Sequence, residues 1–121
     1  MKKSVVILED ESIIALMLKK FLISQNHVIT GIAKDAQTAI ELVKNSKPDL
    51  IILDVHIKGN IDGIEAYKII KGFYKGPTIF LTGNSLDILN REKNQHGYYV
   101  LEKPVSLSDL KKTIDLICTN N

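Results

Sequence analysis

The chain has 121 residues, a single cysteine and a formal net charge of +2, with lysines spread along its length. This length fits one domain, one cysteine allows no internal disulfide bond, and scattered lysines give no expectation of direct nucleic-acid binding. No apolar run approaches the roughly 18 residues that span a membrane, and acidic residues interrupt the only stretch near the start that could resemble a signal peptide, so we expect a cytoplasmic protein without membrane contact.

Apolar periodicity predicts alternating strands and helices from the start of the chain. Residues 5–8 are all apolar and predict a buried strand, and apolar residues at helical spacing then predict a helix over about residues 11–25. Residues 28–33 predict a second strand. The apolar residues of the next helix lie between Ala36 and Val43, and a proline soon after them ends the helix.

The middle of the chain contains its most strongly apolar run. Residues 50–53 are four branched apolar residues, which is typical of a strand buried on both faces, and Asp54 follows them at once. Two glycines and an asparagine within residues 55–63 predict a loop. We expect a third helix after this loop, with an apolar stripe formed by Ala66, Ile69, Ile70 and Phe73.

The last part of the chain predicts two more strands and two more helices. Residues 78–81 form the fourth strand, and Thr82 follows at its end. The helix expected over about residues 85–95 has few apolar residues to bury, so we expect it to be the least stable helix. Residues 98–103 form the fifth strand, which a proline ends. The pair Ser106 and Asp109 is typical of a capping box that begins the last helix.

Five strands that alternate with five helices predict one doubly wound α/β domain, in which helices cover both faces of a parallel sheet. Ligands bind at the carboxyl edge of such open sheets. Polar residues lie at the carboxyl ends of four predicted strands, and these residues are Glu9, Asp10, Asp54, Thr82 and Lys103. We therefore expect the functional site at this edge.

The three acids suggest a metal site. If the first and third strands are neighbours, their ends lie about 4.8 Å apart, and Glu9, Asp10 and Asp54 come together. Three ionised carboxylates repel one another unless a pKa rises or a divalent cation neutralises them, and an oxygen site with few protein ligands suits Mg²⁺. The alternative for Glu9 and Asp10 is that each caps the helix that follows.

Lys103 and Thr82 add an ammonium group and a hydroxyl group to the same edge. Together with a metal ion, these groups suit the three oxygens of a phosphoryl group. Phosphoryl transfer depends mostly on positioning and charge stabilisation, and a carboxylate is a known phosphoryl acceptor. We therefore expect Asp54 to accept a phosphoryl group.

At these positions, and over essentially its whole length, the chain resembles the receiver domain of two-component response regulators. The resemblance implies a flavodoxin-like (βα)5 fold with the strand order 2-1-3-4-5. It also implies that Asp54 is the phosphoacceptor, that Thr82 is the switch hydroxyl, and that Lys103, which a proline follows, is the active-site lysine. Glu9 and Asp10 are similar to the paired acids that bind Mg²⁺ in this family.

Two departures from the family pattern affect the loop and the switch. The loop over residues 55–63 is one residue longer than usual, although His56 still occupies the position whose backbone carbonyl completes the metal site. We expect no ligation by the His56 imidazole. Val100 replaces an aromatic residue that changes rotamer in many receivers, and a β-branched side chain is nearly fixed at χ1. We therefore expect the signal to leave the phosphorylation site through the loop after Thr82 and the helix at 85–95. The alternative is an aromatic switch at Tyr98.

The resemblance implies that residues 1–121 form one receiver domain without an output domain in this chain. A sensor histidine kinase or a histidine phosphotransfer protein would phosphorylate Asp54 in a step that requires Mg²⁺. The face formed by the fourth helix, fifth strand and fifth helix would then control an unidentified protein. We expect no enzymatic activity beyond self-phosphorylation and autodephosphorylation.

Three alternatives stay open at this stage. The chain resembles a free-standing receiver, but it could be a receiver excised from a hybrid kinase or a transcriptional regulator. A flavodoxin-like ligand-binding domain would need glycines to hold phosphate after the first strand, where this chain is acidic. A haloacid-dehalogenase-like phosphatase would have a second acid two residues after the nucleophile, where this chain has His56.

Overall fold

The computed structural model describes residues 2–91 and 97–120, which form five strands and five helices in strict alternation. The strands are β1 (Ser4–Leu8), β2 (Val28–Ala33), β3 (Leu50–Asp54), β4 (Thr78–Thr82) and β5 (Tyr98–Glu102). The helices are α1 (Ser12–Ser24), α2 (Ala36–Ser46), α3 (Gly63–Ile70), α4 (Ser85–Arg91) and α5 (Leu107–Asn120). Within the described ranges, no helix combines the length and the hydropathy that crossing a bilayer requires.

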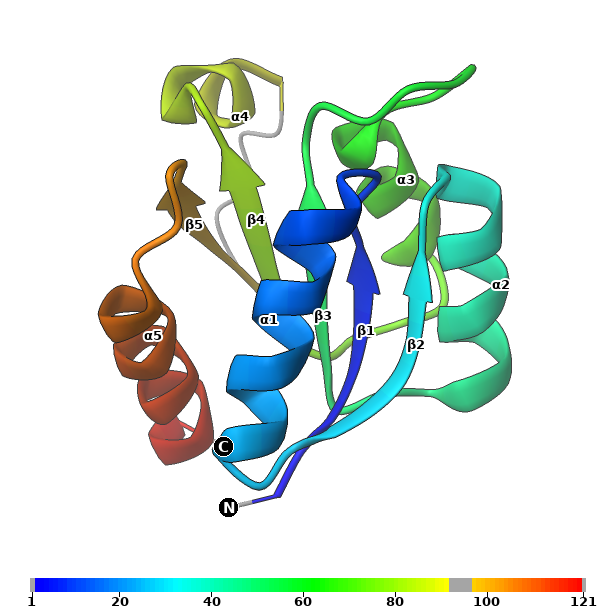
Figure 1. The fold of residues 1–121 in the computed structure, drawn as a ribbon. Coiled ribbons are helices and arrows are strands. Elements are labelled where there is room, and N and C mark those ends of the chain that lie inside the picture. Colours follow the sequence, from blue (N-terminus) through cyan, green and yellow to red (C-terminus); the bar gives the residue numbers. More distant parts are fainter. Residues whose placement is uncertain (1, 92–96, 121) are drawn as a thin grey trace.

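The strands form one parallel sheet in the order β2-β1-β3-β4-β5, which confirms the predicted fold class and strand order (Figure 1). Every residue of β3 and of β4 is buried. Alternate side chains of the central strands enter two separate cores, because successive strand residues point to opposite faces. The helices α1 and α5 pack on one face, and α2, α3 and α4 pack on the other (Figure 1).

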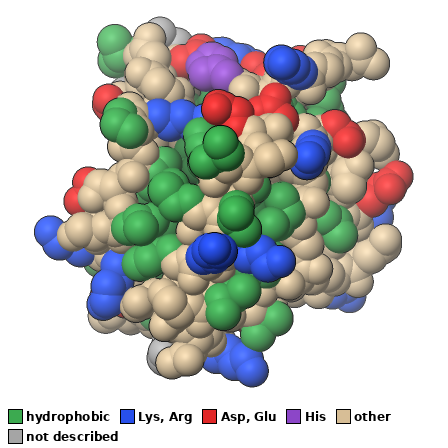
Figure 2. All heavy atoms as spheres, viewed as in Figure 1, with side chains coloured by type: hydrophobic (Ala, Val, Ile, Leu, Met, Phe, Trp, Pro, Cys, Tyr) green, Lys and Arg blue, Asp and Glu red, His purple; other side chains and the backbone are tan. Residues whose placement is uncertain are grey.

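One face of the molecule keeps exposed apolar side chains. Hydrophobic side chains gather over α1 and α5 in the space-filling view (Figure 2), and the most exposed of them is Ile13, at 85%. Leu16 and Ile23 of α1 and Leu116 of α5 are each 50% exposed. The helix α1 is therefore apolar on its outer side as well as on the side that enters the core.

Helix and strand boundaries differ from the prediction by one residue in most cases. The helix α1 begins one residue later and ends one residue earlier than predicted, and β5 ends at Glu102. The described part of α4 ends at Arg91, so the remainder of the helix predicted to about Gln95 lies outside the described residues. Ser106 Oγ accepts a hydrogen bond from the Asp109 N–H at 3.2 Å, as the predicted cap of α5 requires.

The apolar stripe predicted for the third helix was partly wrong. Ile69 and Phe73 are 48% and 40% exposed, whereas Tyr67 is 6% exposed. The ring of Tyr67 packs edge to face against Phe80 and Tyr98, with ring centroids 5.1 and 5.9 Å away. The helix ends at Ile70, and tight turns lead the chain away before Phe73 could reach the core face.

The start of α3 is fixed by a capping box that the sequence analysis did not identify. The Asp62 carboxylate accepts a hydrogen bond from the Glu65 N–H at 3.0 Å, and the Glu65 carboxylate accepts one from the Asp62 N–H at 2.9 Å. The signal was an acid near the end of the predicted loop, followed three residues later by a glutamate.

Gly63 allows α3 to begin directly against the end of β3. Its N–H donates to the Val55 carbonyl at 2.9 Å. A Cβ atom at this position would lie 2.9 Å from the Val55 Cα and even closer to the Asp54 carbonyl oxygen. Both neighbours are backbone atoms, which cannot rotate away. The loop of residues 55–62 therefore closes onto the strand that carries Asp54 only if residue 63 has no side chain.

We predict that Gly63→Ala lowers the free energy of unfolding by roughly 2 kcal/mol or more, because the added methyl group overlaps backbone atoms. Denaturant unfolding of the variant and the parent measures this loss. Gly83→Ala is the matched control, since an added Cβ there meets no atom within 4 Å, and it should change stability by less than about 0.5 kcal/mol. Equal losses in both variants would contradict the steric explanation.

Candidate functional site

Three carboxylates meet at the carboxyl edge of the sheet, at the upper edge in Figure 1. The strands β1 and β3 are neighbours, with Leu8 opposite Leu53, so the residues that follow these two come together. One oxygen from each of Glu9, Asp10 and Asp54 lies within 4.8 Å of the other two. The structure therefore places these three acids together as predicted.

Asp54 is 1% exposed, and both of its carboxylate oxygens accept hydrogen bonds. The Lys103 ammonium donates to Oδ2 at 2.8 Å, and the His56 backbone N–H donates to Oδ1 at 3.1 Å. Burying an ionised carboxylate is costly unless it is paired and hydrogen bonded. The strand end therefore holds a buried charge that two fixed donors stabilise.

Glu9 is fully buried beside this charge. Its Oε2 accepts from the Glu11 N–H at 3.1 Å. Its Oε1 lies 3.4 Å from the Lys103 nitrogen, but it has no partner with hydrogen-bond geometry among the described residues. Burial, and then the neighbouring Asp54 carboxylate, raise the pKa of Glu9 to about 7. This site thus contains more negative charge than the protein neutralises.

Asp10 connects the end of β1 to the loop after β3. It is partly exposed, and its Oδ2 accepts from the Lys58 N–H at 3.1 Å. Neither Glu9 nor Asp10 caps α1 in the usual way, because the cap position is Glu11 and its side chain makes no capping bond. The capping alternative is therefore wrong for Asp10, while Glu9 does accept one N–H near the helix start.

Lys103 follows β5 directly and supplies the positive charge of the site. Its backbone N–H donates to the Thr82 carbonyl at 2.8 Å, and its peptide bond to Pro104 is cis. Partial burial lowers the pKa of Lys103, but the hydrogen bond and charge of Asp54, together with Glu9, outweigh this effect and place the pKa above its usual value. The ammonium group therefore stays charged at neutral pH.

The Thr82 hydroxyl is buried, and it contacts the loop before α4 rather than the carboxylates. It donates to the Asn84 carbonyl at 3.2 Å and accepts from the Asn84 N–H at 3.1 Å. Thr82 thus lies at the predicted strand end, with its hydroxyl group holding the first residues of that loop.

His56 contributes only its backbone to the acid cluster. Its side chain is 60% exposed, and its Nε2 lies 3.7 Å from Asp87 Oδ2 on α4. The imidazole is therefore directed toward α4. Ligation of a metal ion by the His56 carbonyl stays a prediction.

A charged network between α3 and α4 was missed in the sequence analysis. Arg91 donates to both carboxylate oxygens of Asp62, at 2.7 and 3.0 Å, and its guanidinium lies 3.7 Å from Asp87. Burial favours the neutral form of Asp62, but hydrogen bonds from Arg91 and the Glu65 N–H outweigh it and hold the Asp62 pKa below its usual range. Asp62 and Arg91 are 29 residues apart in the sequence, and no local pattern connects them.

The residues at the acid cluster fit Mg²⁺. All candidate ligands are oxygens, which suits a hard cation that keeps several of its waters. The unpaired Glu9 Oε1 and the raised Glu9 pKa both indicate negative charge that a cation would neutralise. A cavity of about 500 Å³ adjoins the cluster, and it is lined by Asp10, Glu11, Lys34, His56 and Lys58.

Comparisons with known proteins find similar sequences. Transcriptional regulatory protein PdtaR of Mycobacterium tuberculosis is 37% identical over 115 residues, which cover 94% of this chain and 56% of PdtaR. The chain therefore spans little more than half the length of this curated relative. Transcription factor SKN7 of Candida albicans is 32% identical over 111 residues, which cover 90% of this chain and 20% of SKN7.

Solved structures show the same similarity. The solution structure of the PhyR response regulator REC domain of Erythrobacter litoralis has a TM-score of 0.87 and 30% identity, and the match covers 98% of this chain and 91% of that one. The anti-anti-sigma factor PhyR of Bartonella quintana has a TM-score of 0.84 and 28% identity, with 98% and 48% covered. The family model described as the response regulator receiver domain matches residues 5–115. This chain belongs to the response regulator receiver domain family.

Proposed function

We propose that this receiver domain accepts a phosphoryl group on Asp54 from a phosphohistidine and passes the signal to a protein partner through α4, β5 and α5. The observation that carries the proposal is the paired, buried carboxylate of Asp54, held by Lys103 at 2.8 Å and adjoined by two further acids. A general phosphoacceptor role is common to the family to which the chain belongs.

The transfer step uses the Asp54 carboxylate as the nucleophile. One carboxylate oxygen forms a bond to phosphorus while the bond between phosphorus and the donor's imidazole nitrogen breaks, and the products are an acyl phosphate and a free imidazole. Lys103, already 2.8 Å from Oδ2, offers its ammonium to the arriving phosphoryl oxygens. The His56 N–H, which donates to Oδ1, keeps the carboxylate oriented.

The residues that would hold Mg²⁺ are Glu9, Asp10, the Asp54 side chain and the His56 carbonyl. When bound, the ion supplies the positive charge that lets an anionic carboxylate approach an anionic phosphoryl group. Loop residue Lys58 donates its N–H to Asp10, so the loop helps to fix the direction of that carboxylate.

The Thr82 hydroxyl connects the phosphorylated site to α4. A hydroxyl that donates to a phosphoryl oxygen can no longer donate to the Asn84 carbonyl, so phosphorylation competes with the bond that now holds the loop. The helix α4 is held by Arg91 to Asp62 and by Asp87 near His56. These polar contacts face water on one side, so they are weak compared with a packed core.

An aromatic switch at Tyr98, in which the ring changes rotamer, is less suited to carry the signal. The Tyr98 ring is 8% exposed and packs against Tyr67 and Phe80, with centroids 5.9 and 5.4 Å away. Rotation of this ring would disrupt both edge-to-face pairs, each worth roughly 0.5 to 1.5 kcal/mol. Val100 packs against the same core from the same face of β5. We therefore favour the route through the loop after Thr82.

We propose that the donor is a sensor histidine kinase or a histidine phosphotransfer protein, and that the domain acts in the cytoplasm. Its output would be contact with a downstream protein rather than direct binding of nucleic acid. We propose no turnover of a separate substrate, only self-phosphorylation and autodephosphorylation. The solved PhyR relative is described as an anti-anti-sigma factor, which supports a protein as the downstream partner.

We expect one phosphoryl group to be added to the parent chain when it is incubated with acetyl phosphate and Mg²⁺, as measured by intact-protein mass spectrometry. Asp54→Asn and addition of a chelator should each abolish the added mass, because the first removes the nucleophile and the second removes the cation. Asp115→Asn is the control, since Asp115 is exposed on α5 and pairs with Lys111, and it should be labelled like the parent. Full labelling of Asp54→Asn would refute the assignment.

We expect Glu9→Gln to stabilise the metal-free protein above pH 7. The raised pKa of Glu9 means that the folded state binds more protons than the unfolded state between about pH 4.5 and 7, so its contribution to stability falls as pH rises through that window. The full loss is roughly 3 kcal/mol. Unfolding curves from pH 4 to 8 should therefore show a difference between variant and parent that grows with pH.

Glu41→Gln is the matched control for this measurement, because Glu41 is exposed on α2 and its carboxylate accepts from Gln37. It should leave the pH dependence nearly unchanged. Mg²⁺ at ten times its dissociation constant should add roughly 1.4 kcal/mol to the parent, and less to Glu9→Gln. A metal-free Glu9→Gln less stable than the parent at pH 8 would show that the carboxylate is needed mainly as a partner for the Glu11 N–H and Lys103.

We expect Arg91→Ala to release α4 without phosphorylation. The amide chemical shifts of residues 82–88 in the variant should move toward those of the parent bound to beryllofluoride, because the variant lacks the ion pair with Asp62. Lys111→Ala removes an exposed helical ion pair with Asp115 and is the control. Shift changes restricted to the neighbours of Arg91, or larger changes at the Tyr98 and Tyr99 rings, would contradict the loop route.

A further inference from the structure

Two unpaired hydroxyl groups lie far from Asp54, at the opposite edge of the sheet. Among the described residues, the buried side-chain atoms without a hydrogen-bond partner are Glu9 Oε1, Tyr74 OH and Thr78 Oγ1. The first belongs to the acid cluster. Tyr74 and Thr78 lie between the end of α3 and the start of β4. A buried hydroxyl without a partner lowers stability, so two of them in one place suggest a use outside folding.

Two cavities meet at Tyr74. The larger has a volume of about 460 Å³ and lies between the end of α2 and the turn after α3, with Val43, Pro48 and Phe73 as its apolar lining. The smaller has a volume of about 210 Å³ and reaches Thr78, which is 1% exposed. Tyr74, Lys75 and Gly76 line both. The larger volume is in the range of small-molecule sites.

The larger cavity is lined by positive charge. Lys44, Lys47 and Lys75 contribute to its walls, and Asp49 is the one acid among its lining residues. The Asp49 carboxylate is already occupied, because its Oδ2 accepts from the Ser4 N–H at 2.9 Å and from the Ser4 hydroxyl at 3.1 Å. The cavity is therefore lined by three lysines and one acid, so positive charge is in excess. The Lys75 ammonium also donates to the Lys71 carbonyl at 3.0 Å, and the charge of Asp49 acts on the Tyr74 hydroxyl.

The aromatic side chain of Phe73 lines the cavity next to these lysines. Phe73 is 40% exposed, and the Lys44 ammonium lies 5.3 Å from the centre of its ring. Exposure of a phenylalanine at the rim of a cavity is costly unless another apolar group covers it. Burial raises the pKa of the Tyr74 hydroxyl above its usual value, so the hydroxyl keeps its proton and serves as a donor.

Gly76 keeps the Tyr74 hydroxyl in its place. A Cβ atom at position 76 would overlap the Tyr74 hydroxyl oxygen and its ring carbon Cζ, and would lie 3.0 Å from Cε1. The tyrosine ring can occupy the wall between the two cavities only because residue 76 has no side chain. This close approach gives the hydroxyl a defined position at the sheet edge.

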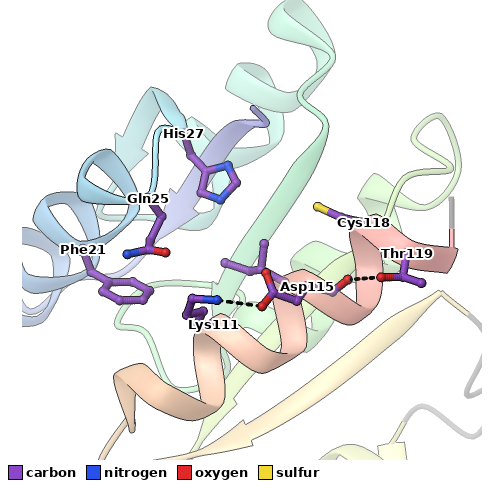
Figure 3. A pocket seen from close by; sticks show the side chains of 8 residues that line it. Phe21, Gln25, His27, Lys111, Asp115, Cys118 and Thr119 are labelled. Carbon is purple, nitrogen blue, oxygen red and sulfur yellow. Dashed lines mark hydrogen bonds and ion pairs between the residues drawn. The ribbon is translucent and has the colours of Figure 1, made fainter. Parts of the chain in front are cut away.

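The cavity between α1 and α5 lacks these features, although its volume of about 410 Å³ is similar (Figure 3). Its charged groups Lys111 and Asp115 bind each other at 2.9 Å, as the dashed line in Figure 3 marks. His27 Nδ1 accepts from the Lys3 N–H at 3.1 Å. Its lining residues contribute no buried polar atom without a partner. A ligand there would meet a lysine and an aspartate that are already paired, and no buried polar atom without a partner.

We propose that the larger cavity beside Tyr74 is a binding site for a small amphipathic anion, meaning a molecule with an apolar ring and a carboxylate, sulfonate or phosphate group. The ring packs on Phe73, Val43 and Pro48. The anionic group lies among the three lysines and accepts a hydrogen bond from the Tyr74 hydroxyl. The site is separate from Asp54, so the proposal does not depend on phosphorylation.

A matched pair of probes tests this site. The anionic probe is 8-anilinonaphthalene-1-sulfonate, and the neutral probe is N-phenyl-1-naphthylamine, which has the same rings without the sulfonate. Titration followed by amide chemical shifts should show saturable binding of the anionic probe at one site, with changes centred on residues 43–49 and 73–76. The neutral probe should bind about tenfold more weakly, because the charge-assisted hydrogen bond is lost.

Variants then separate a binding role from a structural one. Tyr74→Phe should bind the anionic probe about tenfold more weakly and yet have a higher melting temperature, because it removes an unpaired buried hydroxyl. Lys47→Gln should weaken binding about two- to fivefold. Lys111→Gln, in the cavity between α1 and α5, is the charge-matched control and should bind like the parent.

Several results would overturn the proposal. Three results would each show that the probe binds exposed apolar surface without specificity. They are shift changes centred on the exposed apolar residues of α1 and α5, binding that does not saturate, and equal affinity for the two probes. Unchanged affinity in Tyr74→Phe would show that the hydroxyl is not a ligand donor. Labelling of Asp54 by acetyl phosphate should remain as in the parent in Tyr74→Phe, which distinguishes failure of this site from failure of the phosphoacceptor.

Discussion

The interaction on which the site depends is the hydrogen-bonded ion pair between Lys103 and Asp54. It connects the ends of β5 and β3, which are separated by β4 in the sheet, and it lets an ionised carboxylate remain at 1% exposure. Burial, and then the neighbouring Asp54 carboxylate, raise the pKa of Glu9 to about 7 although Lys103 lies nearby. The resting fold therefore keeps a second carboxyl group buried beside Asp54 at a cost in stability, and this cost supports the proposal that the site binds a cation.

Much of the fold and the site could be predicted because both follow from short runs of residues that are adjacent in the sequence. The buried residues of β3 and β4 and the polar residues at their ends are adjacent in sequence, so a strand prediction also places Asp54 and Thr82 at one edge. The third helix was harder, because apolar residues occur on both of its sides and the sequence pattern did not show that Tyr67, rather than Ile69, enters the core. Contacts between distant polar residues, such as Arg91 with Asp62, have no local signature. The orientation of the Thr82 hydroxyl depends on a loop conformation and could not be predicted either.

The helix α4 is held to the sheet by different contacts from the other four helices. The helices α1, α2, α3 and α5 bury apolar residues in the two cores, whereas in α4 the polar contacts of Asp87 and Arg91 supplement the buried side chain of Ile88. Apolar packing changes little with small shifts in charge, but ion pairs and hydrogen bonds respond directly to a new charge nearby. A helix with such polar contacts is thus suited to respond to a phosphoryl group. In the proposed switch, the aromatic cluster of Tyr67, Phe80 and Tyr98 would be the fixed frame against which α4 moves.

The double role of Asp62 restricts which residues can occupy that position. As the cap of α3 it could be replaced by asparagine, serine or threonine at small cost, because each side chain has an oxygen that accepts an N–H. As the partner of Arg91 it must be an acid, since only a carboxylate offers two charged oxygens to a guanidinium. Aspartate satisfies both demands, whereas glutamate satisfies only the second. Position 62 and position 91 would therefore be expected to vary together among receiver domains that hold α4 in this way, and independently among those that do not.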